Sequence, residues 1–272
     1  MEVNKVYHAD LFDIVDEVVP DKSIDVGIFD PPYNISSQST DTINWKSKEK
    51  KEGKQSESLA NSKNIRMINE EWDKFDSIEH YIEWADAWID KAFSKLKDDG
   101  SMFIFGSYHN IGLINYILQK QERMIINDIA WYKRNAVPNI ACRRLQASYE
   151  TILWVAKDKK YRFNYKKVKQ ALYEGDSIKK ENKQLRNVWD IPTKAEKEFK
   201  HPSKKPIAVI ERCLDMAGID DGLVLDFFGG SGTTAAAAIH KNMKYILIEK
   251  EKEYVEVCNR RIQKTLESLR QE

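Results

Sequence analysis

The chain has 272 residues, of which 42% are hydrophobic and 32% charged, a composition that favours one globular domain with a polar surface. No apolar run approaches the ~20 residues of a membrane span, and the first residues lack a signal-peptide core, so we expect a cytoplasmic protein that contacts no membrane. Cys142, Cys213 and Cys258 form no CxxC or Cys/His group, which favours a reducing compartment and argues against a bound metal.

The net charge of +1 conceals an uneven distribution of charge along the chain. Residues 155–205 carry 16 Lys and Arg against 7 Asp and Glu, so the remainder of the chain is acidic. A basic segment on an acidic protein predicts a polyanionic partner, although a lysine-rich solvated surface would give the same count.

Short apolar runs alternate with helical patterns, which is typical of a doubly wound α/β protein. We expect a single domain with a mostly parallel, seven-stranded, Rossmann-like sheet. Its strands are predicted at residues 3–8, 24–29, 102–105, 125–131, 151–155, 223–225 and 245–248. Helices are predicted at residues 78–96 (with Gly100 as the stop), 206–216, 233–240 and 251–269.

Two stretches interrupt this repeat. Residues 36–70 are rich in Ser, Lys, Asn and Glu, and we expect a mobile surface loop that follows the second strand. Residues 157–200 are basic and interleaved with aromatic side chains, which suits a small insertion that contacts a polyanion. The remaining part, residues 201–272, contains a glycine-rich turn between a strand and a helix.

Asp30-Pro31-Pro32-Tyr33 directly follows the second predicted strand, at the edge where open α/β sheets bind ligands. Pro32 restricts Pro31 to an extended conformation, so the Pro31 carbonyl is held beside the Asp30 carboxylate. Two adjacent acceptors suit an exocyclic amine with two N–H donors, and Tyr33 offers a face on which a planar base can stack. The alternative is an ordinary strand exit, capped by Asp30 and stopped by the prolines.

Residues 226–234 form a second motif, Asp-Phe-Phe-Gly-Gly-Ser-Gly-Thr-Thr, between a strand and an alanine-rich helix. This strand, glycine loop and helix are typical of a nucleotide-binding unit, and Glu249 lies 17 residues after Gly232, where an acid can bind ribose hydroxyls. A dinucleotide-dependent dehydrogenase stays open as an alternative, although position 235 is Ala where a Gly-x-Gly-x-x-Gly loop requires Gly.

Together these motifs resemble the DNA amino-methyltransferases of the beta class, in which the Asp-Pro-Pro-Tyr motif precedes target recognition and the cofactor loop comes last. The resemblance extends over roughly residues 6–261 and includes residues 201–206, His-Pro-Ser-Lys-Lys-Pro, which are similar to the family's His-Pro-Thr-Gln-Lys-Pro. Phe227 departs from the family's usual Pro, and Ser203 and Lys204 depart from Thr and Gln.

The resemblance implies S-adenosylmethionine as the cofactor and assigns roles to individual residues. Catalysis falls to Asp30, Pro31, Pro32 and Tyr33. Cofactor binding falls to Asp10, Phe29, Ser203, Lys205, Asp226, Phe228, Gly230, Ser231, Gly232, Thr233, Thr234 and Glu249. DNA would be the partner, through residues 157–200 as the target-recognition region. Candidate DNA-binding residues are Lys133, Arg134, Arg143, Arg144, Lys166, Lys167, Lys169, Lys179 and Lys180.

The expected activity is methyl transfer to the N6 amine of adenine at a specific DNA sequence, because Asp-Pro-Pro-Tyr resembles the adenine enzymes and Ser-Pro-Pro-Tyr is commoner in the cytosine-N4 enzymes. Cytosine N4 therefore stays an alternative, as does a non-catalytic DNA-binding subunit. Methylation at cytosine carbon 5 is disfavoured because no cysteine follows a proline. The family also makes a homodimer and a cognate restriction endonuclease candidate partners.

Overall fold

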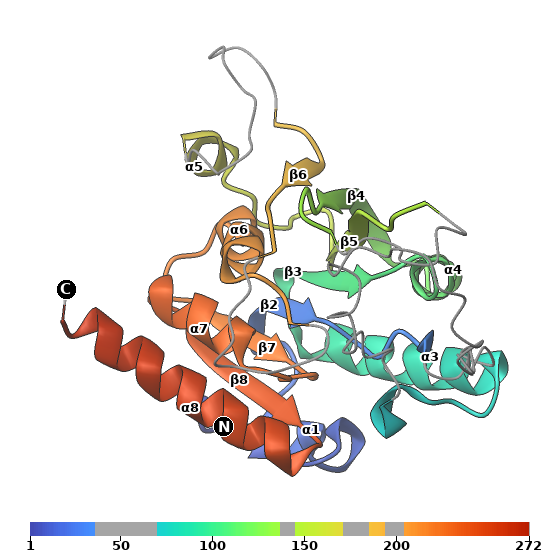
Figure 1. Cartoon of the computed structure of the whole chain (residues 1–272), viewed down its shortest axis with the longest axis horizontal. Coiled ribbons are helices and arrows are strands. Elements are labelled where there is room, and N and C mark those ends of the chain that lie inside the picture. Colours follow the sequence, from blue (N-terminus) through green and yellow to red (C-terminus); the bar gives the residue numbers. More distant parts are fainter. Residues whose placement is uncertain (36–69, 137–144, 171–184, 194–203, 272) are drawn as a thin grey trace, which may run out of the picture.

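The computed structural model contains one eight-stranded sheet with helices on both faces (Figure 1). It describes residues 1–35, 70–136, 145–193 without 171–184, and 204–271. The strands are β1 (Lys5–His8), β2 (Ile24–Phe29), β3 (Leu96–Gly106), β4 (Met124–Tyr132), β5 (Tyr149–Ala156), β6 (Val188–Asp190), β7 (Leu223–Asp226) and β8 (Lys244–Glu249). The helices are α1 (Leu11–Val18), the 3₁₀ turn η2 (Glu71–Asp73), α3 (Ile78–Lys95), α4 (Ile111–Lys120), α5 (Tyr165–Gln170), α6 (Ile207–Ala217), α7 (Thr233–His240) and α8 (Lys252–Leu269).

The strands lie in the order β1-β8-β7-β2-β3-β5-β4-β6. Every neighbouring pair is parallel except the two that involve β5, which runs antiparallel to both β3 and β4. The doubly wound, mostly parallel sheet predicted from the sequence is confirmed, with all seven expected strands present.

The sheet has one strand more than the sequence predicted. β6 pairs with β4 in parallel, with Trp189 opposite Trp131, and both indoles are almost completely buried. A three-residue strand in a basic segment carries too short a pattern to be recognised. Trp189 is therefore a core residue rather than an aromatic surface contact of the predicted target-recognition region.

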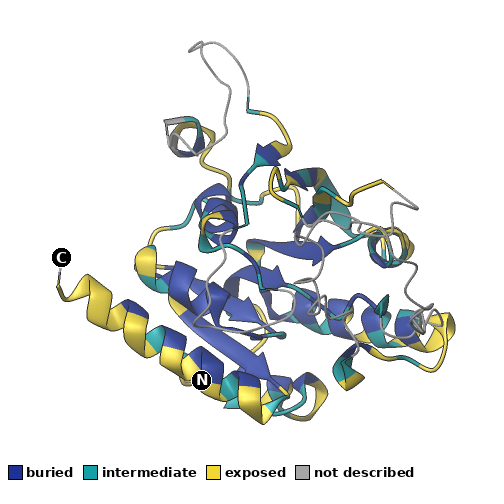
Figure 2. Cartoon of the chain, in the orientation of Figure 1, coloured by how far each residue is buried: buried dark blue, intermediate teal, exposed yellow. Residues whose placement is uncertain are grey.

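Two hydrophobic clusters cover the two faces of the sheet. The larger includes Val26 and Ile28 of β2 and packs under α5, α6, α7 and α8, whereas Phe29 belongs to the other, under α1, α3 and α4. Neighbouring residues of a strand point to opposite faces, which explains this division. The buried interior and the exposed outer surface of α8 are plain in Figure 2.

α3 matches the predicted amphipathic helix closely. Ser77 caps its first turn by accepting the backbone N–H of His80, and Tyr81, Trp88 and Phe93 lie in the core. The predicted stop at Gly100 is wrong, because the helix already ends at Lys95 and β3 starts at the next residue. Within the described ranges, no helix has the length and apolar character needed to cross a membrane.

Candidate active site

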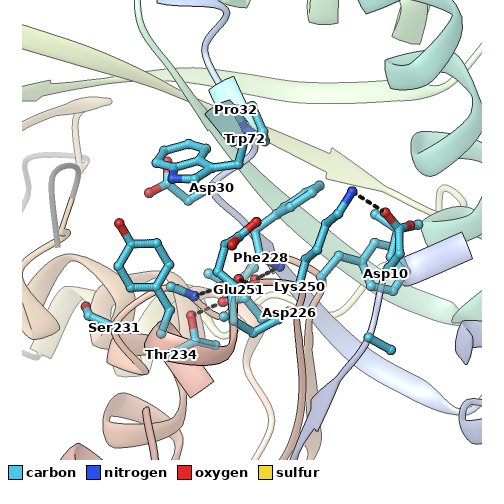
Figure 3. A pocket seen from close by; sticks show the side chains of 18 of the residues that line it. Asp10, Asp30, Pro32, Trp72, Asp226, Phe228, Ser231, Thr234, Lys250 and Glu251 are labelled. Atoms are coloured by element: carbon cyan, nitrogen blue, oxygen red, sulfur yellow. Dashed lines mark hydrogen bonds and ion pairs between the residues drawn. The ribbon is translucent and has the colours of Figure 1, made fainter. Parts of the chain in front are cut away.

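The two sequence motifs meet at one edge of the sheet. Asp30 directly follows β2, Asp226 ends the neighbouring strand β7, and Glu249 ends β8. Parallel neighbours bring these carboxyl ends together around a cavity of about 350 Å³. Figure 3 shows Asp30 and Pro32 on one side of this pocket and Asp226, Phe228 and Thr234 on another.

The glycine-rich loop is held in shape by the Asp226 carboxylate. One oxygen accepts the backbone N–H of Phe228 at 2.8 Å, and the other accepts the Thr234 hydroxyl at 2.6 Å. Burial raises the pKa of Asp226 to about 7, although these two hydrogen bonds oppose the shift. The Asp226 side chain therefore fixes the conformation of the loop through these two hydrogen bonds and also lines the pocket.

Glycine is required at position 232. Its φ of +75° lies in the left-handed region, and a Cβ there would come within 2.9 Å of the Cys258 Cα in α8. Gly230 also has a positive φ, and its N–H donates to Glu249 Oε2 at 2.6 Å. The loop thus turns tightly against α8 and opens α7, as the motif predicted.

Two acidic residues predicted to bind the cofactor line the pocket, and each also has an internal partner. Besides the Gly230 contact, Glu249 accepts the backbone N–H of Glu251 at 2.8 Å. Asp10 caps α1 by accepting the N–H of Phe12 at 3.0 Å, and Lys250 Nζ lies 3.1 Å from its other oxygen. Glu251, which was not among the predicted cofactor residues, also lines the pocket (Figure 3).

The structure places most of the predicted cofactor residues in the pocket wall. The lining includes Asp10, Lys205, Asp226, Phe228, Gly230, Ser231, Thr233, Thr234 and Glu249. Gly232 instead forms the N-cap of α7, and Ser203 lies outside the described residues. Phe29 is not part of this wall: its side chain is fully buried between Trp88 and Phe227, because it faces the α3 side of the sheet.

Asp30 sits in a compact network of charged side chains. Its Oδ1 accepts the Tyr33 hydroxyl at 2.8 Å, and its Oδ2 lies 2.6 Å from Lys205 Nζ. The Lys205 ammonium also lies over the Tyr33 ring, 5.1 Å from its centroid. Lys205, predicted only as a cofactor ligand, is thus also the direct partner of the predicted catalytic carboxylate.

A second carboxylate completes this network, and the sequence reasoning missed it. Glu150 Oε2 lies 3.2 Å from the Tyr33 hydroxyl and 3.6 Å from Lys205 Nζ, and its Oε1 lies 2.8 Å from Lys133 Nζ. Lys133, a predicted DNA-binding residue, is only 16% exposed and pairs with Glu150 in this network. The network contains two carboxylates and two ammonium groups, so its charges balance.

Burial and charge pairing shift the pKa values of the groups in this network in opposite directions. Burial raises the pKa of Asp30 despite the opposing effect of Lys205. For Glu150 the burial effect is outweighed by Lys205 and Lys133, and its pKa is lowered. Burial would lower the pKa of Lys205, but Asp30 and Glu150 raise it overall, so the lysine stays charged.

Four of the other predicted DNA-binding residues lie in the part of the chain that the structure describes. Arg134 pairs with Asp190 at 2.9 Å and remains 44% exposed. Lys166 is exposed and Lys169 half-buried on α5, whose Lys167 is described by its backbone alone. The remaining candidates, Arg143, Arg144, Lys179 and Lys180, lie outside the described residues, as does nearly all of the predicted loop at 36–70.

A glycine-rich nucleotide loop and a rigid acceptor motif around one pocket define a methyltransferase-type α/β enzyme. A sequence model of the DNA methylase family (N6_N4_Mtase) matches residues 24–260. The chain therefore belongs to this family and is a DNA methyltransferase that uses S-adenosylmethionine. The expected enzyme class and cofactor are confirmed, and a non-catalytic DNA-binding subunit is not supported.

Curated relatives agree with this assignment. The chain is 34% identical over 263 residues to the Type II methyltransferase M2.LlaDCHI of Lactococcus lactis subsp. cremoris, covering 94% of this chain and 88% of the relative. It is 32% identical to the Type II methyltransferase M2.DpnII of Streptococcus pneumoniae, with coverage of 94% and 88%.

Solved structures share the fold. The cytosine-N4-specific PvuII DNA methyltransferase aligns with a TM-score of 0.68 at 19% identity, over 98% of this chain and 91% of that structure. The M1.HpyAVI complex with S-adenosylmethionine aligns with a TM-score of 0.63 at 24% identity, over 95% and 98%.

Proposed function

We propose that this DNA methyltransferase methylates the exocyclic N6 of adenine at a specific DNA sequence. The observation that carries this proposal is the position of the Asp30 carboxylate, which lines the same pocket as the glycine-rich loop at residues 226–234. An amine bound by Asp30 would lie beside the methyl donor. Positioning of this kind is the main requirement of a direct transfer.

The pocket wall fits S-adenosylmethionine in chemical character. Phe228 and Trp72 offer flat apolar surfaces for an adenine ring, while Glu249 and Asp10 supply acceptors for hydroxyl groups. Lys204 and Lys205 also line the pocket and are candidate cations for the methionine carboxylate. When bound, the cofactor would supply a methyl group on a sulfonium sulfur; its transfer to the amine nitrogen would break the carbon–sulfur bond, and the thioether would leave.

The protein's contribution is to make that amine nucleophilic. The lone pair of an aryl amine is delocalised into its ring, and acceptors for both N–H groups favour a tetrahedral nitrogen with a localised lone pair. Asp30 and the Pro31 carbonyl are the proposed acceptors, and their fixed orientation avoids reorganisation during the reaction. Asp30, which lies 2.6 Å from Lys205 Nζ, is also placed to receive the proton that the methylated nitrogen releases.

Adenine is favoured over cytosine because position 30 is Asp rather than Ser. Cytosine N4 presents a chemically similar amine and is the second candidate. DNA that has been methylated in vitro and digested to nucleosides should yield N6-methyl-2′-deoxyadenosine, identified by mass spectrometry. N4-methyl-2′-deoxycytidine as the product would instead establish the second candidate.

DNA recognition requires an extended surface and access to a paired base. Extrusion of the base costs a few kcal/mol, which phosphate contacts by the basic residues 157–200 would offset. We place the enzyme in the cytoplasm with its DNA substrate. The homodimer and the cognate restriction endonuclease remain predictions from the family resemblance; the Type II names of the relatives are consistent with a restriction–modification system.

A further inference from the structure

The turn that carries the predicted catalytic residues is fixed by side chains from other elements. Pro31 and Pro32, which follow Asp30, have no N–H to donate, but each of the next three residues has one. The N–H groups of Tyr33 and Asn34 donate to Asp73 Oδ1 at 2.7 and 2.8 Å, and that of Ile35 donates to Asp73 Oδ2 at 2.9 Å. One carboxylate therefore binds three consecutive backbone groups.

A second contact holds the same turn from α3. The Tyr81 hydroxyl donates to the Pro32 carbonyl at 3.0 Å, and Asn110 Nδ2 donates to that hydroxyl at 3.1 Å. Asp73 is 1% exposed, and Tyr81 and Asn110 are fully buried. Buried polar side chains that are satisfied by the backbone of one turn fix its position more firmly than solvated contacts would. We call Asp73, Tyr81 and Asn110 the buried cradle.

The η2 turn connects this cradle to the cofactor pocket. Glu71 and Trp72 line the pocket, whereas the next residue, Asp73, is turned away from it and toward the catalytic turn. Trp72, Asp30 and Pro32 all line this pocket (Figure 3). The same three-residue element thus touches the place of the methyl donor and the backbone that carries the amine acceptors.

From this arrangement we infer that Asp73 and Tyr81 are positioning residues for methyl transfer. They fix the backbone from Pro32 to Ile35 and thereby set the distance between the Asp30 acceptor and the cofactor pocket. The inference rests on the proposed function of Asp30. It assigns a role to the segment after the loop at 36–70, which the sequence reasoning left without one.

Two nearly isosteric substitutions test the inference. In Asp73→Asn, an amide group replaces Oδ2 and opposes the N–H of Ile35, while Oδ1 still accepts from Tyr33 and Asn34. Tyr81→Phe removes only the hydroxyl that binds Pro32. We expect each to lower the single-turnover methyl-transfer rate by on the order of 100-fold, the loss that a misplacement of about 1 Å can cause. Cofactor affinity, measured by equilibrium dialysis, should stay close to that of the wild type.

Asp25→Asn is the matched control. Asp25 is also buried, accepts the backbone N–H of Leu223 at 2.9 Å, and pairs with Lys97 and Arg162, but it lies at the opposite end of β2. It should lower the melting temperature without changing the transfer rate per folded molecule. Equal transfer rates for Asp73→Asn and Asp25→Asn, each corrected for the folded fraction, would overturn the inference, as would unchanged transfer in Tyr81→Phe.

The proposed role of Asp30 is tested separately from the positioning role of Asp73 and Tyr81. If Asp30→Ala retained wild-type transfer, the assignment of Asp30 would be wrong, whatever the cradle variants showed. If Asp30→Ala lost transfer while both cradle variants kept it, the proposed site would stand and only the positioning role would fall.

Discussion

Asp30→Ala is expected to lower the rate of methyl transfer by at least about 10²- to 10³-fold, the loss that follows removal of one preorganised electrostatic group. The substitution removes the carboxylate that accepts an amine hydrogen and that receives the released proton. Single-turnover transfer of a labelled methyl group to DNA measures the effect. Cofactor binding should persist, because the loop at 226–234 is held by Asp226 and Glu249 without help from Asp30.

The variant is expected to fold, so the loss can be assigned to chemistry. Lys205 would lose its partner at 2.6 Å and keep Glu150 at 3.6 Å, a carboxylate that it shares with Lys133, so the variant should be less stable and its transfer rate is corrected for the folded fraction. Equilibrium dialysis with labelled cofactor is the companion measurement. If the variant lost cofactor binding but transferred methyl groups normally at saturating cofactor, the roles assigned to the two motifs would be reversed.

The sequence was sufficient to locate both walls of the pocket. Asp30, Asp226 and Glu249 each follow or end an apolar run that could be recognised locally, and parallel pairing places such ends at one edge of a sheet. The order of strands and helices along the chain was predictable for the same reason. Local patterns determine the elements, and the carboxyl-edge rule determines where their ends meet.

Glu150 could not be found in this way, because β5 is antiparallel. In a parallel sheet the first residues of a strand lie far from the ligand edge, but reversal of β5 places its beginning at the edge where β3 ends, with Thr151 opposite Gly106. Strand direction depends on pairing between distant segments, which periodicity alone does not reveal. If a strand is expected to run antiparallel to its neighbours, a carboxylate at its start becomes a candidate active-site residue.

The assignment of Lys205 was incomplete for a related reason. It lies 175 residues after Asp30, and only the folded chain brings the two within hydrogen-bond distance. Asp73 is separated from the catalytic turn by the loop at 36–70, so its contact with that turn could not be predicted from the sequence either. Phe29 was predicted as a cofactor residue from its place beside Asp30 in the sequence, but strand alternation turns its side chain toward the core.

Lys205→Met is expected to shift the acid limb of the pH–rate profile to higher pH. Burial already raises the pKa of Asp30, and Lys205 opposes that shift. Without the ammonium group, the pKa of Asp30 should rise further, so the carboxylate required for catalysis would form only at higher pH. Transfer rates measured across pH, each at saturating cofactor, test this directly, and an unchanged acid limb would show that another group controls ionisation of the site.

The same variant should be destabilised at neutral pH by about 3–5 kcal/mol, the cost of removing one partner of a buried ion pair. A carboxyl group with a raised pKa in the folded state binds its proton more tightly than in the unfolded state, so this stability loss should be smallest at low pH and grow as pH rises through that pKa. Lys95→Met is the matched control, since Lys95 is 4% exposed and bridges Asp16 and Asp21 at 2.8 and 2.7 Å, away from the pocket. The Lys95→Met variant should have a lower stability but an unchanged pH–rate profile. Adding Glu150→Gln to Lys205→Met should recover part of the lost stability, because the second substitution removes one of the two carboxylates that Lys205 neutralises.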